Sequence, residues 1–233
     1  RIPLPARGHA AAAHPIRPEA VGFARRPGTF ALVIDCARGQ IAHRLTPPEG
    51  RQFNGPGAFS ADGAWLFTSE VIAETSQGRI GVWHAARGYA RIDEWPSHGI
   101  GPHELRRMGD GTLVVANGGI QTDPTDRRKL NLDTMRPNLT YLSPEGALLD
   151  QVTLHPDLHQ APLRHLALGT DGTVACALQW EGDPAEPVPL LALHRRDHPV
   201  VMCPTPENEA WAMKGYAGSI ALGGDRIALT SPP

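Results

Sequence analysis

Short apolar runs separated by tight turns recur along the whole chain. Four stretches share one pattern, an apolar run, a turn with glycine and a β-rich run: residues 57–69, 103–117, 164–179 and 218–231. A looser version covers residues 20–35. Asp and Gly tolerate a positive φ, so Asp-Gly between two apolar runs is a strong signal for a β-hairpin. The pattern therefore predicts a hairpin in each stretch, with turns at Gly28, Gly63, Gly111, Gly172 and Gly224.

A second pair of apolar runs follows three of these hairpins. The pairs are residues 79–86 and 90–97, 138–143 and 147–155, and 190–197 and 199–205. Each unit is thus four antiparallel strands in roughly fifty residues, which is the size of a propeller blade. A β-sandwich is the competing architecture, but it does not explain why the same turn returns once per four strands. We predict an all-β fold, one β-propeller domain over residues 1–233, with units that begin near Ala20, Gly57, His103, Arg164 and Gly218.

The repeat also predicts which side chains meet. In a propeller the innermost strands surround a central channel, so residues at equal distance before the turn lie at one level. His103 and His165 stand at nearly equal distances before Gly111 and Gly172. The strands that follow the turns return to the same face. The predicted cluster at one channel mouth is His103, His165, Glu70, Asn117 and Gln179.

The chemistry of this cluster leaves alternatives open. His103-Glu104 does not begin an H-E-x-x-H zinc motif, because the fifth position is Arg107 and the segment is strand-like. The two histidines could tie neighbouring blades together through hydrogen bonds, bind a ligand, or coordinate a metal with Glu70. We favour the structural tie and expect no metal or other cofactor.

Basic side chains lie near the repeated motifs. Arg25 and Arg164 are the candidates, and Arg7 and His9 could join them. An arginine here would pair with carboxylates between blades or hold an anionic ligand through two parallel hydrogen bonds. The long segment 118–138 between two strands suits a loop that covers the channel mouth, or a mobile surface loop.

Composition narrows the function classes. The chain has 233 residues, 41% of them hydrophobic, and a formal net charge of −2, which is typical of a folded globular protein without a basic surface for nucleic acid. No apolar run is long enough to span a membrane as a helix. The three cysteines, Cys36, Cys176 and Cys203, are expected to pack as free thiols. The five tryptophans are expected to pack between blades.

The order of several motifs resembles the bacterial family called domain of unknown function 1513. The motifs are "FARRPGTF" (23–30), "FSADG" (59–63), "GIGPHEL" (99–105), "VANGGIQT" (115–122), "LNLDTMRPNLTYL" (130–142), "RHLA" (164–167) and "YAGSIA" (216–221). The resemblance implies a seven-bladed propeller exported to the periplasm by the twin-arginine route. It also implies a genetic link to imelysin-type and di-haem peroxidase proteins of iron uptake. The resemblance assigns no catalytic residues to this chain.

Two departures from the family pattern affect these expectations. The family has Gly-His-Gly before "FS", where this chain has Gly55-Pro56-Gly57, so one histidine of the channel ring is replaced. The chain also ends inside its fifth unit, so we expect a propeller that is incomplete at the C-terminus. The expected function is non-catalytic binding of an unknown small molecule or a protein partner. The alternative is a metal-dependent or redox enzyme with its site at the channel mouth.

Overall fold

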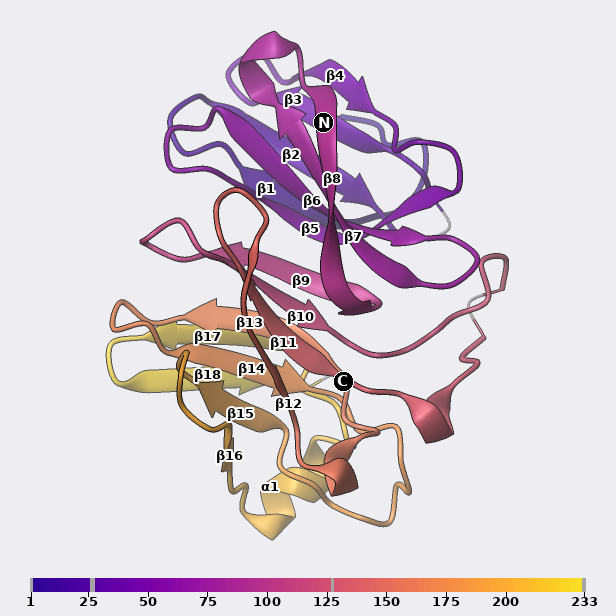
Figure 1. Cartoon of the computed structure of the whole chain (residues 1–233), viewed down its shortest axis with the longest axis vertical. Helices are drawn as coiled ribbons and strands as arrows, with labels where there is room; N and C mark the ends of the chain where they lie inside the picture. Colours follow the sequence, from indigo (N-terminus) through magenta and orange to yellow (C-terminus); the bar gives the residue numbers. More distant parts are fainter. Residues whose placement is uncertain (1, 26–27, 127, 232–233) are drawn as a thin grey trace.

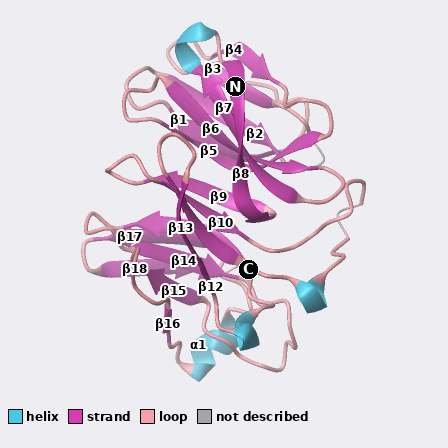
Figure 2. Ribbon diagram, viewed as in Figure 1, coloured by secondary structure: helices cyan, strands magenta, loops and turns pink. Residues whose placement is uncertain are grey.

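The fold was taken from a computed structural model that describes residues 2–25, 28–126 and 128–231. It consists of antiparallel sheets that follow one another in chain order (Figures 1 and 2). The first sheet contains β1 (Gly8–Ala13), β2 (Glu19–Ala24), β3 (Ala31–Asp35) and β4 (Gln40–Leu45). The second contains β5 (Arg51–Phe59), β6 (Trp65–Ile72), β7 (Gln77–His84) and β8 (Ala90–Ile100).

The C-terminal half continues the same order. The third sheet contains β9 (Pro102–Arg107), β10 (Leu113–Asn117), β11 (Asn138–Leu142) and β12 (Leu148–Thr153). The fourth contains β13 (Leu163–Leu168), β14 (Val174–Leu178), β15 (Leu191–His194) and β16 (Val201–Cys203), and the fifth is the hairpin β17 (Ser219–Gly223) and β18 (Arg226–Thr230). The helical segments are η1 (Ala85–Arg87), η2 (Leu132–Thr134), η3 (Pro156–Leu158) and α1 (Glu207–Ala212).

The first strand of each sheet lies beside the first strand of the next. β1 contacts β5, β5 contacts β9, β9 contacts β13, and β13 contacts β17. These five inner strands arrange the sheets like the blades of a fan, with the first sheet at the top of Figure 1 and the fourth and fifth sheets in its lower half. The predicted all-β architecture of four-stranded antiparallel blades is therefore confirmed. The described blades form an open fan.

One predicted unit boundary is wrong. The first unit begins at Gly8, and the hairpin with Gly28 connects the second and third strands of its sheet rather than the first and second. The equivalent turn, between β1 and β2, has no glycine. The side chain of His14 holds it instead. The His14 Nδ1 atom accepts hydrogen bonds from the backbone amides of Ile16 and Arg17, at 3.1 and 3.0 Å.

Alternating side chains of each sheet fill the spaces between neighbouring blades. On β6, Leu66 packs into the core shared with the first sheet, whereas the next residue, Phe67, packs into the core shared with the third. A larger core, which includes Leu166, joins the third, fourth and fifth sheets. Both faces of the inner sheets are thus buried, which explains the apolar runs in the sequence.

Two further expectations can be compared with the structure. Cys36, Cys176 and Cys203 are free thiols, but Cys36 lies exposed in the turn after β3 instead of packing in a core. Of the tryptophans, Trp83 is buried, whereas Trp211 is 47% exposed on α1, a helix that the pattern did not predict. The expectation that every tryptophan packs between blades is therefore wrong.

Candidate functional site

His103 and His165 lie side by side on the adjacent inner strands β9 and β13. Their ring centroids are 4.8 Å apart and the rings meet edge to face, at 89°. The prediction that these residues share one level on neighbouring blades is confirmed. The link from β8 into β9 is tight because Gly101 adopts a φ of +60°, a conformation that favours glycine.

Each of the two imidazoles is fixed by a partner on the other's strand. The His103 Nδ1 atom lies 2.9 Å from the carbonyl oxygen of Arg164 on β13. A carbonyl oxygen only accepts, so Nδ1 of His103 carries the proton and Nε2 presents a lone pair. The His165 Nδ1 atom lies 2.9 Å from Oε2 of Glu104 on β9. The two histidines thus tie the third blade to the fourth.

Glu104 is the carboxylate of this cluster, and sequence reasoning missed it. Its side chain is buried, and its second oxygen accepts from Nε of Arg106 at 2.5 Å. Alternation along β9 places Glu104 on one face of the strand with Arg106, but it does not predict the contact with His165, which comes from the next blade. The motif "HE" therefore contributes a histidine and a carboxylate to the same contact between blades.

A third histidine joins the pair from the first blade. The His9 ring on β1 lies 5.9 Å from the His103 ring, at 88°. β5 runs between these two strands, and it packs closely because Gly55 has no side chain. A Cβ atom at that position would lie 2.0 Å from the carbonyl oxygen of His103. We call His9, His103 and His165 the histidine row.

Electrostatics keep the centre of the histidine row neutral. Burial lowers the pKa of His103 well below its usual range, and electrostatic interactions with Arg164, His165 and His9 lower this pKa further. His103 is thus a neutral imidazole at neutral pH, which is the state that accepts a hydrogen bond or binds a metal through Nε2.

The structure places Glu70 away from the histidine row. Its Oε1 atom accepts from Arg91 Nη1 at 2.6 Å and from Thr68 Oγ1 at 2.5 Å, while Oε2 lacks a hydrogen-bond partner among the described residues. Burial raises the pKa of Glu70 against the opposing effect of Arg91. The neighbouring residue on the strand, Ser69, reaches β9 instead and donates to the carbonyl oxygen of Pro102 at 2.7 Å.

Asn117 and Gln179 also have structural partners. Asn117 is fully buried, accepts from Ser97 Oγ at 2.7 Å and donates to Asn138 Oδ1 at 2.9 Å, so it holds β10 between β8 and β11. Gln179 donates to Glu181 Oε1 at 2.6 Å. The distance of each residue from the turn glycine predicted how far along its strand it lies. It did not predict on which face of the strand the side chain lies.

The two candidate arginines occupy different places. The Arg164 guanidinium lies over the ring of Tyr216, 5.8 Å from its centroid. Arg25 follows β2, and its backbone amide donates to the carbonyl oxygen of Arg7 at 2.8 Å. The structure therefore brings Arg164, but not Arg25, to the wall of the cavity beside the histidine row.

A cavity of about 90 Å³ lies beside His103. It is lined by Asn54, Gly101, His103, Gly118, Ile120, Thr122, Lys129, Pro162 and Arg164. Gly118, Ile120, Thr122 and Lys129 belong to the segment 118–138, so this loop supplies part of the cavity wall. Lys129 anchors the loop through an ion pair with Glu181 of the fourth blade.

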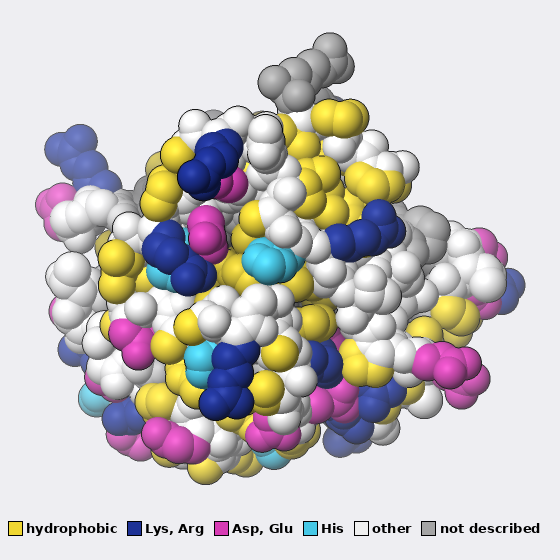
Figure 3. All heavy atoms as spheres, turned by 90° about the horizontal axis from the view of Figure 1, so that it is seen from above, with side chains coloured by type: hydrophobic (Ala, Val, Ile, Leu, Met, Phe, Trp, Pro, Cys, Tyr) yellow, Lys and Arg dark blue, Asp and Glu magenta, His cyan; other side chains and the backbone are white. Residues whose placement is uncertain are grey.

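The described residues contain no ready-made metal site. Across residues 2–25, 28–126 and 128–231, no three His, Cys, Asp or Glu side chains are arranged to hold a metal ion. No helix in these ranges is long and apolar enough to cross a membrane. On the face seen in Figure 3, basic and acidic side chains are interspersed and neither sign forms a broad field.

Comparisons with known proteins agree with the architecture. No curated protein matches the chain. The hydrazine synthase of Kuenenia stuttgartiensis is similar with a TM-score of 0.67 and 14% identity, over 92% of this chain and 57% of that one. A structure described as a eukaryotic initiation factor reaches a TM-score of 0.45 at 16% identity, over 66% of this chain and 34% of that one.

The likeness to the hydrazine synthase concerns the fold, and a family model identifies the family. The chain spans little more than half the length of the hydrazine synthase chain, and at 14% identity the likeness shows a propeller-like fold alone. The family model described as "Protein of unknown function (DUF1513)" matches residues 2–233. The chain therefore belongs to the DUF1513 family.

Proposed function

We propose that the protein is a non-catalytic propeller that binds a small ligand or a protein partner at the inner-strand ends, beside the histidine row. The observation that carries the proposal is the convergence of His9, His103 and His165, from three separate blades, next to a cavity. Rigid strands that present polar groups to a cavity are the usual basis of a binding site.

The polar atoms of the cavity define the ligand chemistry. Arg164 supplies a positive charge, and neutral His103 has an acceptor at Nε2. The Asn54 side chain is 8% exposed, and its Oδ1 atom has no hydrogen-bond partner among the described residues. The site therefore suits a small acidic group that also carries a proton donor, such as a hydrogen phosphate or a hydroxy acid, free or on a partner.

The family resemblance supplies the proposed setting. Export to the periplasm would place the protein among iron-uptake proteins, and an imelysin-type or di-haem peroxidase protein would be the partner. Co-purification of the full chain with the imelysin-type protein of the same bacterium tests this setting independently of the small ligand.

The ligand proposal is tested by following the histidine Cε1 protons by NMR while inorganic phosphate is added. We expect the His103 and His165 resonances to shift in a saturable way, and Arg164→Met to remove this response. Arg44→Met is the matched control, because the Arg44 guanidinium also lies over an aromatic ring, that of Phe30 at 5.1 Å, but lines no part of this cavity. A response that survives Arg164→Met contradicts the proposed site.

One observation favours a second candidate, a metal-dependent or redox enzyme. Nδ1 of His103 faces a carbonyl oxygen and Nδ1 of His165 faces a carboxylate, which is how metal-binding histidines are held so that Nε2 points to the ion. Metal analysis of protein purified without chelator separates the candidates. Stoichiometric metal that is lost in His103→Ala would favour the enzyme.

A further inference from the structure

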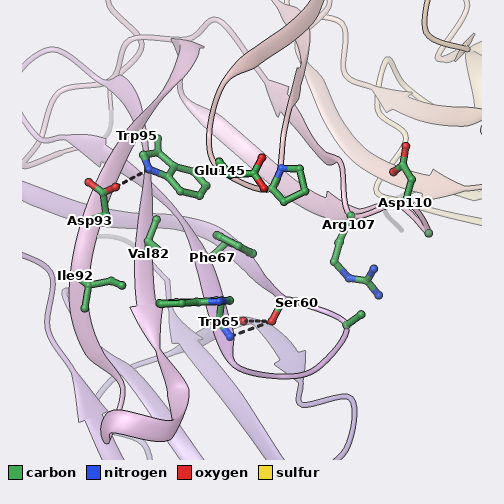
Figure 4. Close-up of a pocket in the computed structure, with 14 residues that line it drawn as sticks. Ser60, Trp65, Phe67, Val82, Ile92, Asp93, Trp95, Arg107, Asp110 and Glu145 are labelled. Atoms are coloured by element: carbon green, nitrogen blue, oxygen red, sulfur yellow. Dashed lines mark hydrogen bonds between the residues drawn. The ribbon is translucent and has the colours of Figure 1, made fainter.

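A second, larger cavity lies between the second and third blades and shares no residue with the cavity beside the histidine row. Its volume is about 530 Å³, within the range of roughly 300–1,000 Å³ that is usual for small-molecule sites. Its walls come from the turn after β5 and from β6, β7 and β8 on one side, and from the end of β9 and the turns after β9 and β11 on the other (Figure 4).

The floor of this cavity is aromatic. Figure 4 shows Phe67 and Val82 between the indole rings of Trp65 and Trp95. Phe67 packs against Trp95 with ring centroids 5.5 Å apart, and both tryptophans keep part of their surface exposed. Partly exposed indoles that share a hollow with other apolar side chains form an apolar patch of the kind that marks ligand-binding grooves.

Hydrogen bonds hold the two tryptophan residues in place. The Trp95 Nε1 atom donates to Asp93 Oδ2 at 2.8 Å, and the backbone amide of Trp65 donates to Ser60 Oγ at 3.0 Å (Figure 4). The Trp65 ring also meets the His84 ring edge to face, with centroids 4.5 Å apart. The aromatic surfaces are therefore positioned before any ligand arrives.

The rim of the cavity is acidic. Among the described residues that line the cavity, the carboxylates are Asp93, Asp110 and Glu145, and the one cation is Arg107. The hydrogen bond from Trp95 lowers the pKa of Asp93, and the backbone amide of Thr112 lowers the pKa of Asp110, so both are ionised at neutral pH.

Arg107 does not neutralise this rim. Its Nε atom donates to the carbonyl oxygen of Phe59 at 3.1 Å, and its Nη1 atom donates to the carbonyl oxygen of Met108 at 2.9 Å. The guanidinium is thus held against the backbone, and no carboxylate forms an ion pair with it among the described residues. Arg91 and Arg196 also act on Asp93 and Asp110 but lie outside the lining. The lining itself, with three carboxylates and one arginine, carries a net negative charge above an aromatic floor.

We propose that this cavity binds a small organic cation with an apolar body, such as an aromatic or alkyl ammonium compound. Indole faces attract cations through the quadrupole of the ring, and carboxylates at the rim attract the same charge from a greater distance. A neutral ligand of equal shape uses only the floor, and an anion meets repulsion at the rim.

The test uses the full chain and three soluble probes: benzyltrimethylammonium, benzyl alcohol and benzoate. Saturation-transfer NMR detects binding, and calorimetry gives the affinity. We expect benzyltrimethylammonium to bind at least roughly ten-fold more tightly than benzyl alcohol and benzoate to show no transfer. Equal affinity for the cation and the alcohol, or no transfer to the cation at about 10 mM, would overturn the proposal.

Variants that remove the rim charges but keep their hydrogen bonds distinguish an effect of charge on binding from an effect on folding. Asp93→Asn and Glu145→Gln retain oxygen acceptors for Trp95 Nε1 and for Ser143 Oγ, so folding should be preserved. The double variant should weaken binding of the cation by roughly five-fold or more and leave the alcohol unaffected. Unchanged cation affinity in the double variant would also overturn the proposal.

The fourth blade offers a matched control. Asp171 accepts from the backbone amide of Thr173 at 3.1 Å in the Gly172 turn, much as Asp110 accepts from Thr112 in the Gly111 turn, yet Asp171 lies outside the cavity. Asp171→Asn should therefore leave the affinity unchanged, whereas Asp110→Asn should reduce it. If both variants reduced the affinity for the cation equally, the cause would be the overall charge of the protein, and the proposed site would be overturned.

Discussion

At the scale of single residues, the adjacent pair His103-Glu104 serves two neighbouring blades. The imidazole of His103 binds the backbone of β13, and the carboxylate of Glu104 orients His165 on that same strand. Reciprocal contacts of this kind fix the register between inner strands, because sliding one strand breaks both hydrogen bonds. In both rings Nδ1 forms the contact between the blades. The Nε2 atom on the other side of each ring remains for a ligand.

His103→Ala removes the donor to the carbonyl oxygen of Arg164. Stranding a buried acceptor costs about 1–3 kcal/mol, and this acceptor is partly buried, so we expect the free energy of unfolding to fall by roughly 1 kcal/mol, at the lower end of that range. Denaturant unfolding followed by far-UV circular dichroism measures it. His198→Ala, at an exposed histidine, serves as the control. An unchanged stability of His103→Ala would mean that the contact with Arg164 does not hold the blades.

The lowered pKa of His103 predicts a pH dependence of stability. The folded state binds fewer protons than the unfolded state near the unfolded pKa of about 6.5, so stability is highest above that pH and decreases as the pH falls. The raised pKa of Glu70 acts in the opposite direction, because its contribution is present at low pH and is lost as the pH rises. Comparison with His103→Gln separates the two.

Between pH 7.5 and pH 5, thermal unfolding of the wild-type protein should therefore show a steeper loss of melting temperature than that of His103→Gln. Glutamine can still donate to the carbonyl oxygen of Arg164, but it does not titrate. Identical pH profiles for the two proteins would show that His103 does not contribute to the acid sensitivity.

At the scale of elements, the turns between the first two strands of neighbouring blades interlock. The His14 side chain ends the first β-strand of the first blade and lies 3.1 Å, through Nε2, from the carbonyl oxygen of Gly63 in the second. The Nδ1 atom of His14 accepts from two backbone amides, so Nε2 carries the proton and donates. Position 63 requires glycine for two reasons. Its backbone has a positive φ, and the His14 ring leaves no room for a Cβ atom.

Gly63→Ala and Gly39→Ala separate these two requirements. Both glycines have a positive φ, +68° and +66°, but a Cβ at position 63 would lie 2.1 Å from the His14 ring, whereas nothing lies within 4 Å at position 39. Each alanine should cost about 1–2 kcal/mol for the left-handed backbone. Gly63→Ala should cost roughly 1–3 kcal/mol more because the turns must separate. Equal losses in denaturant unfolding would contradict the interlocked turns.

At the scale of the whole molecule, stability is expected to vary from blade to blade. The middle strands β10 and β14 have every residue buried and a paired strand on each side. The fifth sheet is a lone hairpin, and alternate residues of β18 are exposed. The strands β10 and β14 are therefore expected to be better protected against local unfolding than the fifth sheet.

Hydrogen exchange followed by mass spectrometry tests this gradient. We expect the amides of β10 and β14 to exchange by global unfolding and those of β18 to exchange orders of magnitude faster through local opening. β4, an outer strand of a complete blade, is the comparison for edge exposure alone. Equal protection of β18 and β10 would show that the hairpin belongs to the same cooperative unit as the centre.

The sequence by itself determined the repeat, the four-stranded units and the level of His103 and His165, because turn chemistry and strand alternation are local properties. It located the first unit wrongly, since the His14 turn carries no glycine signal. Only the tertiary structure decided which face each side chain occupies: Glu104 rather than Glu70 meets the imidazoles, and Trp65 and Trp95 meet an acidic rim. Those contacts join residues from different blades, and their partners depend on how the sheets pack against each other, which no local pattern encodes.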